Sequence, residues 1–196
     1  MKENLETLYK NHPVLLDRVL LNIRRALVSK LKWLDFAFGR AYRLTENSAE
    51  LSSFIYPAVY KGAGEYLSVL PNDNFGNFSW FDIYDPQKLI KATPALTQYN
   101  ISGALIFWYD LRSIYADNDF LYTEEVKNEI ISVLTSPGLL STAGHLTITD
   151  IYERPENIYK GYNLQKVDKQ FFIYPYAGLR IEFTITTREL CQHYTM

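Results

Sequence analysis

Apolar and polar residues alternate strictly near the end of the chain. From Leu179 to Thr186 the odd positions are apolar, and the even positions carry charges or hydroxyls. This period of two predicts a β-strand with one face in the core and one polar face. Arg180, Glu182 and, further on, Arg188 carry the charges. We expect this polar face to be exposed and offered to a partner, although an ordinary solvated sheet face shows the same alternation.

Two segments repeat their apolar residues with the period of an α-helix. Residues 14–31 place leucine, isoleucine and valine every three or four positions, directly after Pro13, which suits a first helical turn. Residues 123–138 begin with Thr123 as a candidate N-cap, continue with two glutamates and stop at Pro-Gly. Each pattern predicts an amphipathic helix that needs a surface to cover.

Three further segments predict strands. Residues 33–44 alternate but are interrupted at Gly39, and residues 145–153 alternate throughout. Residues 101–115 are apolar at both odd and even positions, which predicts a central strand buried on both faces.

The region before the central strand has a weaker pattern. Residues 54–85 predict two or three short antiparallel strands joined by glycine- and asparagine-rich connections. The polar stretches 45–53 and 85–98 predict loops.

The order of these elements is helix, antiparallel strands, helix, strands. It predicts an α+β fold in which a mainly antiparallel sheet is backed on one face by helices. We expect residues 1–32 to form an N-terminal helical segment that packs on a single α+β domain, residues 33–196. A chain of 196 residues is long enough for one full core.

Composition and charge narrow the class of protein. The chain is 47% hydrophobic and 21% charged, as globular proteins are, and its net charge of −2 gives no reason to expect nucleic-acid binding. No 18-residue apolar run or secretory signal is present, and the single cysteine cannot form an internal disulfide, so we expect a cytoplasmic protein without a membrane span. We interpret the positive cluster on the first predicted helix as a solvated face: Arg24, Arg25, Lys30 and Lys32.

Aromatic residues are unusually frequent, at 15% of the chain, with 16 tyrosines and 11 phenylalanines. Tyrosine suits protein–protein contacts because it is amphipathic and has few torsions to freeze, but aromatic residues also favour strands. The elbow Tyr174-Pro175-Tyr176 and the loop Tyr60-Lys61-Gly62 are the candidate contact sites that the sequence offers.

No pattern of reactive or metal-binding residues stands out. The three histidines are far apart, and the pair Cys191 and His193 has no third orienting group nearby. The glycine-rich stretch 62–67 lacks the last glycine of a dinucleotide loop and a helix behind it, and the acidic stretch 117–125 lacks calcium-loop spacing. We therefore expect no catalytic residues, no cofactor and no metal.

Three stretches carry a resemblance to a known class of proteins. EEVKNEIISVL, NIYKGYNLQKVDKQFFIYPYAGLRIEFTI and PAVYKGAGEYLSVLPND resemble small proteins from the structural-gene clusters of tailed phages and prophages, especially those of gut Bacteroidetes. In size and element order the best match is the tail-terminator or tail-completion class. The resemblance covers about residues 55–190 and includes no catalytic motif. The long connection 70–100 and the extended N-terminal helix depart from compact members, so head–tail joining is a second role that the resemblance allows.

The resemblance implies a non-enzymatic structural protein that associates with itself into a ring, with a hexamer as the first expectation. Such a ring binds tail-tube and head-completion proteins, in the host cytoplasm during assembly and then in the virion. Our candidate contact residues are Tyr60, Lys61, Tyr174, Tyr176, Arg180, Glu182 and Arg188.

The alternative is a small-ligand-binding domain or an enzyme. It would have a pocket between sheet and helices, lined by aromatic residues such as Trp80, Phe107 and Trp108. Self-association would favour the first hypothesis, and an enclosed cleft with clustered ionisable groups would favour the second.

Overall fold

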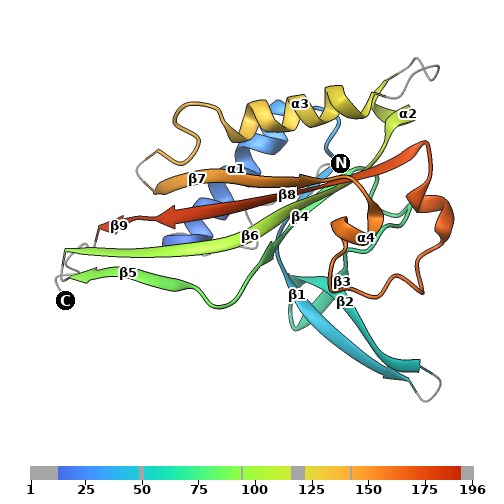
Figure 1. Cartoon of the computed structure of the whole chain (residues 1–196), viewed down its shortest axis with the longest axis horizontal. Helices are drawn as coiled ribbons and strands as arrows, with labels where there is room; N and C mark the ends of the chain where they lie inside the picture. The colour runs from blue at the N-terminus through green and yellow to red at the C-terminus, as the bar shows by residue number, and fades with distance from the viewer. Residues whose placement is uncertain (1–12, 49–50, 94, 116–121, 142, 191–196) are drawn as a thin grey trace.

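The fold is α+β, as the sequence predicts: a mainly antiparallel sheet with helices packed on it (Figure 1). The computed structural model describes residues 13–48, 51–93, 95–115, 122–141 and 143–190. Over these residues the sheet has nine strands, in the order β3-β2-β1-β4-β6-β8-β7, with β5 and β9 also paired to β6. The neighbouring strands are antiparallel except β1 and β4, which are parallel. The strands are β1 (Phe36–Ser48), β2 (Leu51–Gly62), β3 (Glu65–Ser68), β4 (Phe78–Ile83), β5 (Lys88–Thr93), β6 (Leu96–Asp110), β7 (Gly144–Tyr152), β8 (Tyr176–Thr187) and β9 (Glu189–Leu190).

Strand β6 is the centre of the sheet, which confirms the predicted central strand, although it spans Leu96–Asp110 and residues Leu111–Ile114 form the short helix α2. It pairs with β8 along Asn100–Asp110 and with β4 on its other edge. Every residue from Gly103 to Tyr109 is buried, because both faces of the sheet are covered here. The strands predicted at residues 145–153 and 179–186 are also present, as β7 and β8.

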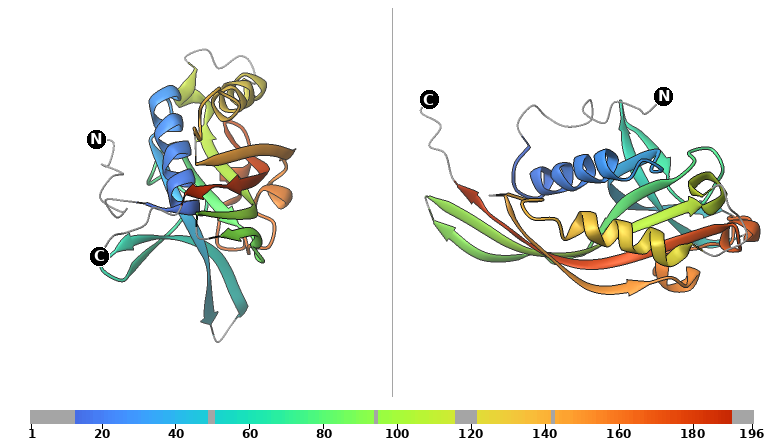
Figure 2. Two further views of the ribbon diagram at one scale, coloured as in Figure 1. Left: turned by 90° about the vertical axis from the view of Figure 1, so that its left-hand side faces the viewer. Right: turned by 90° about the horizontal axis from the view of Figure 1, so that it is seen from above.

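Helices α1 (Leu15–Lys30) and α3 (Thr123–Leu134) lie on one face of the sheet (Figure 2). Both predicted helices are therefore confirmed, although α3 begins at Thr123 after Tyr122, which makes no side-chain cap. Leu20, Ile23 and Leu27 of α1 are buried in one core with the inward side chains of β6 and β8. Burial of each such side chain stabilises the fold by about 1.5–3 kcal/mol. Among the described residues, no helix is long and apolar enough to cross a membrane.

The positive cluster on α1 is not wholly solvated, which corrects our interpretation of it. Arg24 is buried, and its Nε donates a hydrogen bond of 2.7 Å to the carbonyl oxygen of Ala37 on β1. The side chain therefore helps to fix the helix on the sheet. Arg25, Lys30 and Lys32 are exposed as expected.

The opposite face of the sheet is covered at one end by the segment between β7 and β8. This segment contains the short helix α4 (Pro155–Ile158) and the 3-10 helix η2 (Lys169–Phe172). Figure 2 shows it on the side of the sheet away from α1. Ile158 and Tyr159 join a second core with Trp80 and Trp108. The sheet is therefore backed by α1 and α3 on one face and by this segment on part of the other.

Two predicted loops are strands, which corrects the expectation for residues 45–53 and 85–98. Strands β1 and β2 continue past the body of the protein as a hairpin (Figure 1), in which Thr45, Glu46 and Ser53 are exposed although the backbones are paired. Strand β5 is exposed at all six residues and pairs with β6. Gly39 does not end β1; the register against β4 shifts there instead.

Candidate functional site

The most exposed aromatic cluster lies where β1, β2 and β3 pair side by side. Tyr60 on β2 is directly opposite Tyr66 on β3, and Tyr42 on β1 is opposite Ala58, two residues from Tyr60. Residues that are opposite each other, or two apart on one strand, point to the same face, so the three rings share one face. Their centroids are 5.4 Å (Tyr60–Tyr66) and 5.9 Å (Tyr42–Tyr66) apart. We call this set the tyrosine cluster.

The tyrosine cluster remains open to solvent despite these contacts. The exposed fractions are 45% for Tyr42, 45% for Tyr60 and 49% for Tyr66. The guanidinium of Arg40 lies 5.6 Å from the ring centre of Tyr42, which adds a cation to the same surface. Lys61, a predicted contact residue, is exposed next to Tyr60.

The turn between β2 and β3 holds this surface in place. Gly62, Ala63 and Gly64 have positive φ angles of 110°, 51° and 84°, and the hydroxyl of Tyr60 accepts a hydrogen bond of 3.2 Å from the N–H of Gly64. The glycines thus serve a tight turn, as the sequence suggested, because glycine tolerates positive φ at low cost. Sequence reasoning selected Tyr60 but missed Tyr42 and Tyr66, since only the strand register brings them together.

A second exposed apolar surface lies on β5. Leu89 and Ile90 are 56% and 54% exposed, and Lys88 and Lys91 flank them. Strand β5 lies at the end of the sheet away from the β1–β2–β3 arm (Figures 1 and 2). Among the described residues, large apolar side chains are thus exposed at the tyrosine cluster, on β5, and at Ile173 and Tyr174 before β8, besides Val14 and Ile151 elsewhere.

The expectation of an exposed polar face on β8 was wrong for Arg180, which is buried, whereas Glu182 is half-buried. The side chain of Arg180 is 1% exposed, because the segment before β8 lies over this part of the sheet. Its Nη1 donates to the carbonyl oxygen of Ile158 at 2.9 Å, and its Nη2 lies 3.2 Å from Oδ2 of Asp82. Its Nε donates to Glu182 Oε1 at 3.3 Å. Arg180 thus links β8 and β4 to the segment between β7 and β8 that lies over them.

Two tyrosine hydroxyls complete this buried polar network. Tyr162 donates to Oδ1 of Asp82 at 3.0 Å, and Tyr84 donates to Oε1 of Glu182 at 3.0 Å. Burial raises the pKa of Tyr84 to about 12, against the opposing charge of Arg180. Burial, and then the charge of Asp82, also raises the pKa of Tyr162. Both phenols therefore keep their protons at pH values above the ordinary tyrosine pKa of 10.0. The hydrogen bonds of Arg180 to Ile158 and of Tyr162 to Asp82 hold this part of the segment against the sheet.

The remaining predicted contact residues lie apart from the tyrosine cluster. Tyr174 is exposed, whereas Tyr176 is half-buried and stacks on Trp108 with ring centres 5.1 Å apart. The guanidinium of Arg112 lies 5.6 Å from the ring centre of Tyr176. Arg188 is exposed just after β8. These residues therefore belong to the two ends of β8, and the tyrosine cluster belongs to β1, β2 and β3.

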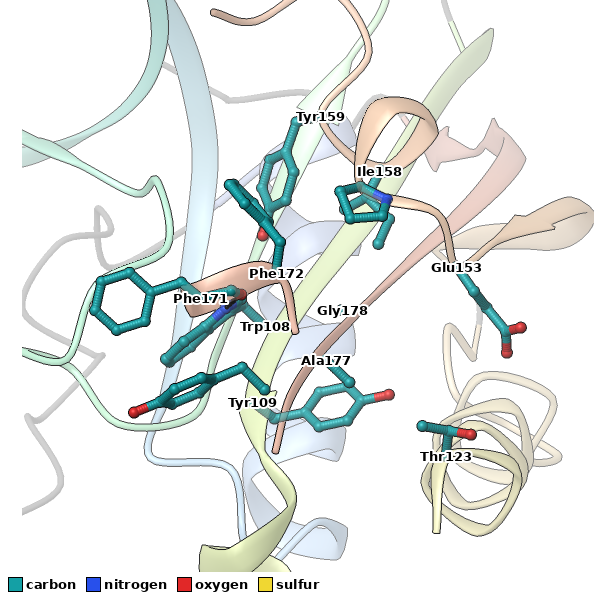
Figure 3. Close-up of a pocket in the computed structure, with 12 residues that line it drawn as sticks. Trp108, Tyr109, Thr123, Glu153, Ile158, Tyr159, Phe171, Phe172, Ala177 and Gly178 are labelled. Atoms are coloured by element: carbon teal, nitrogen blue, oxygen red, sulfur yellow. Dashed lines mark hydrogen bonds between the residues drawn. The ribbon is translucent and has the colours of Figure 1, made fainter. Parts of the chain in front are cut away.

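A pocket with aromatic walls opens beside the start of β8 (Figure 3). Trp108, Phe171, Phe172 and Tyr176 contribute rings to it, and its volume is about 160 Å³. Of the three aromatic residues predicted to line a pocket, Trp108 does so. Trp80 and Phe107 are fully buried in separate cores, on opposite faces of the sheet. The aromatic pocket is thus lined by Trp108 but not by Trp80 or Phe107.

The polar groups of the aromatic pocket are few. The hydroxyl of Tyr159 is buried, and in the described part of the chain it has no hydrogen-bond partner. Thr123 and Glu153 contribute the other polar side chains together with Tyr109. Nζ of Lys127 lies 2.8 Å from the Glu153 carboxylate and also bonds to Glu124. Burial, and then the charge of Glu153, raises the pKa of Tyr109.

Within the described ranges, no three histidine, cysteine, aspartate or glutamate side chains gather closely enough to hold a metal ion. His145 lies exposed on β7. His12, the acidic stretch from Asp117 to Asp119, and the pair Cys191 and His193 lie outside the described residues or extend into their gaps. Neither a comparison with protein-family models nor one with curated proteins finds a match for this chain.

Proposed function

We propose that this protein is a non-enzymatic structural protein that associates with copies of itself into a ring, and that it acts in tail completion or head–tail joining of a tailed phage or prophage. The observation that carries self-association is the tyrosine cluster: three half-exposed rings, in contact with one another, on an arm that projects from the body.

The tyrosine cluster has the chemistry of a protein–protein interface. Tyrosine and arginine are enriched at interface centres, and both are present here as Tyr42, Tyr60, Tyr66 and Arg40. The rings already restrict one another through their contacts, so little side-chain entropy is lost when a partner covers them. Lys61 borders the surface and would lie at its polar rim.

A ring needs two different surfaces on each copy, because head-to-tail contacts close only when one patch meets another. Strand β5 supplies a second patch through Leu89 and Ile90, away from the arm. Among the described strands it pairs with β6 alone, so it lies at an edge of the sheet, where another chain can add a strand. We propose that the tyrosine cluster of one copy meets β5 of the next. Tyr174 and Arg188 remain predicted contacts of lesser weight.

The biological role follows from the resemblance and from this surface chemistry together. A ring of this kind would bind tail-tube proteins on one side and head-completion proteins on the other. We place its assembly in the cytoplasm of a bacterial host, before it becomes part of the virion. The hexamer is the expected form.

The test is the mass of the assembly in solution. Light scattering after size-exclusion chromatography, over a concentration series up to about 100 μM, should give one closed oligomer, with six copies expected. The triple variant Tyr42→Ser/Tyr60→Ser/Tyr66→Ser should be monomeric, with an unchanged far-ultraviolet circular dichroism spectrum. The matched control is Ile151→Ser, which changes an exposed apolar residue on β7; it should assemble normally. A wild-type protein that stays monomeric throughout the series would refute the proposal.

A further inference from the structure

The charges of β5 restrict what kind of surface can cover it. Lys88 and Lys91 are both exposed and stand on either side of the apolar pair Leu89 and Ile90. Within the described residues, neither lysine has an ion-pair partner. Covering an ammonium group without a counter-charge is costly, because the group loses its water. A surface that docks on the apolar pair of β5 therefore needs an acidic group beside it.

The arm offers one such acidic group, Glu65. The acidic residues of strands β1, β2 and β3 are Glu46 and Glu65. Glu46 is already paired, because its Oε2 lies 2.7 Å from Nζ of Lys166. Glu65 is exposed on β3 and has no ion pair within the described part of the chain. It adjoins Tyr66, so a free carboxylate lies at the margin of the tyrosine cluster.

The cations of the arm are distributed unevenly over its strands. Arg40 and Arg43 both belong to β1, which is two strands away from β3. Lys61 is closer to Glu65, since it lies on β2 and precedes Gly62, the residue opposite Glu65. No ion pair joins Lys61 to Glu65 among the described residues. The β1 side of the arm is therefore positive, whereas the β2–β3 side has one charge of each sign.

This distribution favours one side of the arm for the docking of β5. At the β1 side, the lysines of β5 would meet Arg40 and Arg43, and like charges forced together across an interface oppose binding. At the β3 side they would meet Glu65. Strand β3 ends the strand order, so a partner can approach it from its free edge as well as from its face. Charge and access thus both favour β3.

We infer that β5 of one copy docks over β3 of the next copy, and that Glu65 selects this position by pairing with the lysines of β5. The inference deepens the proposed function and rests on it, since it needs two copies in contact. The apolar pair of β5 then lies against Tyr66, and Tyr42 lies at the far margin of the contact. Glu65 is thus a specificity residue, because it admits a positively charged strand that the β1 side of the arm repels.

Reversal of charge on either strand tests the inference. Glu65→Lys should weaken association about 10- to 100-fold, because it sets a cation against the lysines of β5. The double variant Lys88→Glu/Lys91→Glu should weaken association by a similar factor, because it sets carboxylates against Glu65. Light scattering over a concentration series of the full chain measures both changes. Unchanged association in Glu65→Lys would overturn the inference.

Restoration separates a specific charge pair from a general effect of charge. The triple variant Glu65→Lys/Lys88→Glu/Lys91→Glu joins opposite charges again, with the signs exchanged between the two strands. It should associate within about threefold of the wild-type protein, because the substituted groups interact across the contact and their effects are not additive. A triple variant that stays dissociated would show that these charges do not meet.

The two ends of the tyrosine cluster give a second measurement that does not depend on charge. Tyr66→Ser, on β3, should weaken association about tenfold more than Tyr42→Ser, on β1, because only Tyr66 lies at the centre of the inferred contact. The two side chains are exposed to similar fractions, 49% and 45%, so the variants are well matched. Equal losses, or a larger loss in Tyr42→Ser, would place β5 elsewhere on the arm and overturn the inference.

The matched control is Glu125→Lys, which makes the same change of charge at an exposed glutamate of α3, on the side of the molecule away from the arm (Figure 1). It should associate as the wild-type protein does. A wild-type protein that stays monomeric would refute the proposed ring and this inference with it. An oligomeric wild-type protein whose association survives Glu65→Lys would refute this inference alone, so the two failures are distinguishable.

Discussion

Tyrosine is used in opposite ways in two regions of this molecule. On the β1–β2–β3 arm, Tyr42, Tyr60 and Tyr66 touch ring to ring and are half-exposed. Under the segment before β8, Tyr84 and Tyr162 give their hydroxyls to the carboxylates that surround Arg180. In the first region the rings remain exposed to solvent, and in the second the hydroxyls are held in partly buried hydrogen bonds. A high tyrosine content therefore does not indicate one structural role. In this molecule some tyrosines form an exposed surface and others hydrogen-bond inside the fold, and substitutions can distinguish the two roles.

The largest expected effect comes from breaking the buried network. Arg180→Ala should lower the free energy of unfolding by about 3–5 kcal/mol, since it leaves the buried carboxylate of Asp82 without its closest cation. Urea denaturation measures this change. Arg188→Ala, at an exposed arginine just after β8, should change stability by less than about 0.5 kcal/mol. A loss below about 1 kcal/mol for Arg180→Ala would show that the network does not hold the segment.

A single change in the tyrosine cluster should affect association far more than folding. Tyr60→Ala should weaken association by about 2 kcal/mol per contact, or about 30-fold in the dissociation constant, if Tyr60 is an interface hot spot. The monomer should lose less than about 1 kcal/mol, since cross-strand pairs contribute little more than that. Analytical ultracentrifugation and urea denaturation of the same sample measure the two quantities. Equal losses in both would mean that the tyrosine cluster serves only the fold.

Removing one tyrosine hydroxyl in each region compares how much each hydroxyl contributes to stability. Tyr162→Phe should lower the free energy of unfolding by about 1–3 kcal/mol, because the buried acceptor on Asp82 loses its donor. Tyr66→Phe should change stability by less than about 0.5 kcal/mol, because this side chain is half-exposed. Thermal unfolding of both variants gives the contrast directly. Equal effects would remove the distinction between the two uses.

The last prediction concerns the dependence of stability on alkaline pH. The pKa of Tyr84 is raised from 10.0 to about 12 in the folded protein. Between these two values the unfolded chain loses this proton while the folded chain keeps it, so stability falls as pH rises from 10 to 12. Tyr84→Phe should make the decline shallower in urea denaturation at a series of pH values. An identical slope in the variant would show that Tyr84 does not contribute.

Periodicity predicted the parts of the fold in which one face of an element is buried. Strand β8 and helices α1 and α3 all bury an apolar face, so their patterns identify them. Strand β5 gave no such signal, because it is held by backbone pairing while its side chains are exposed, and Thr45, Glu46 and Ser53 of the β1–β2 hairpin are exposed in the same way. A pattern of side chains cannot report a strand that buries neither face.

The candidate surfaces were harder to predict for a different reason. The alternation placed Arg180 on the correct face of β8 but could not show that the face is covered. The cover comes from Ile158, Tyr159 and their neighbours, which lack any regular period. The tyrosine cluster depends on the register of three strands, and Tyr42 and Tyr66 become neighbours only once that register is known.

Strand β1 is part of both the body of the sheet, where it pairs with β4, and the projecting hairpin, where it pairs with β2. Its first residues, Phe36 and Ala37, pair with β4 within the body of the sheet, and the same strand then continues outward to carry Tyr42. No linker separates the interior part from the projecting part, so the direction of the arm is fixed by the twist of one continuous strand. If a neighbouring copy docks on that arm, the angle between the two copies depends on how β1 packs inside each subunit. Packing changes near Phe36 would then alter the diameter of such a ring while the contact residues stay the same.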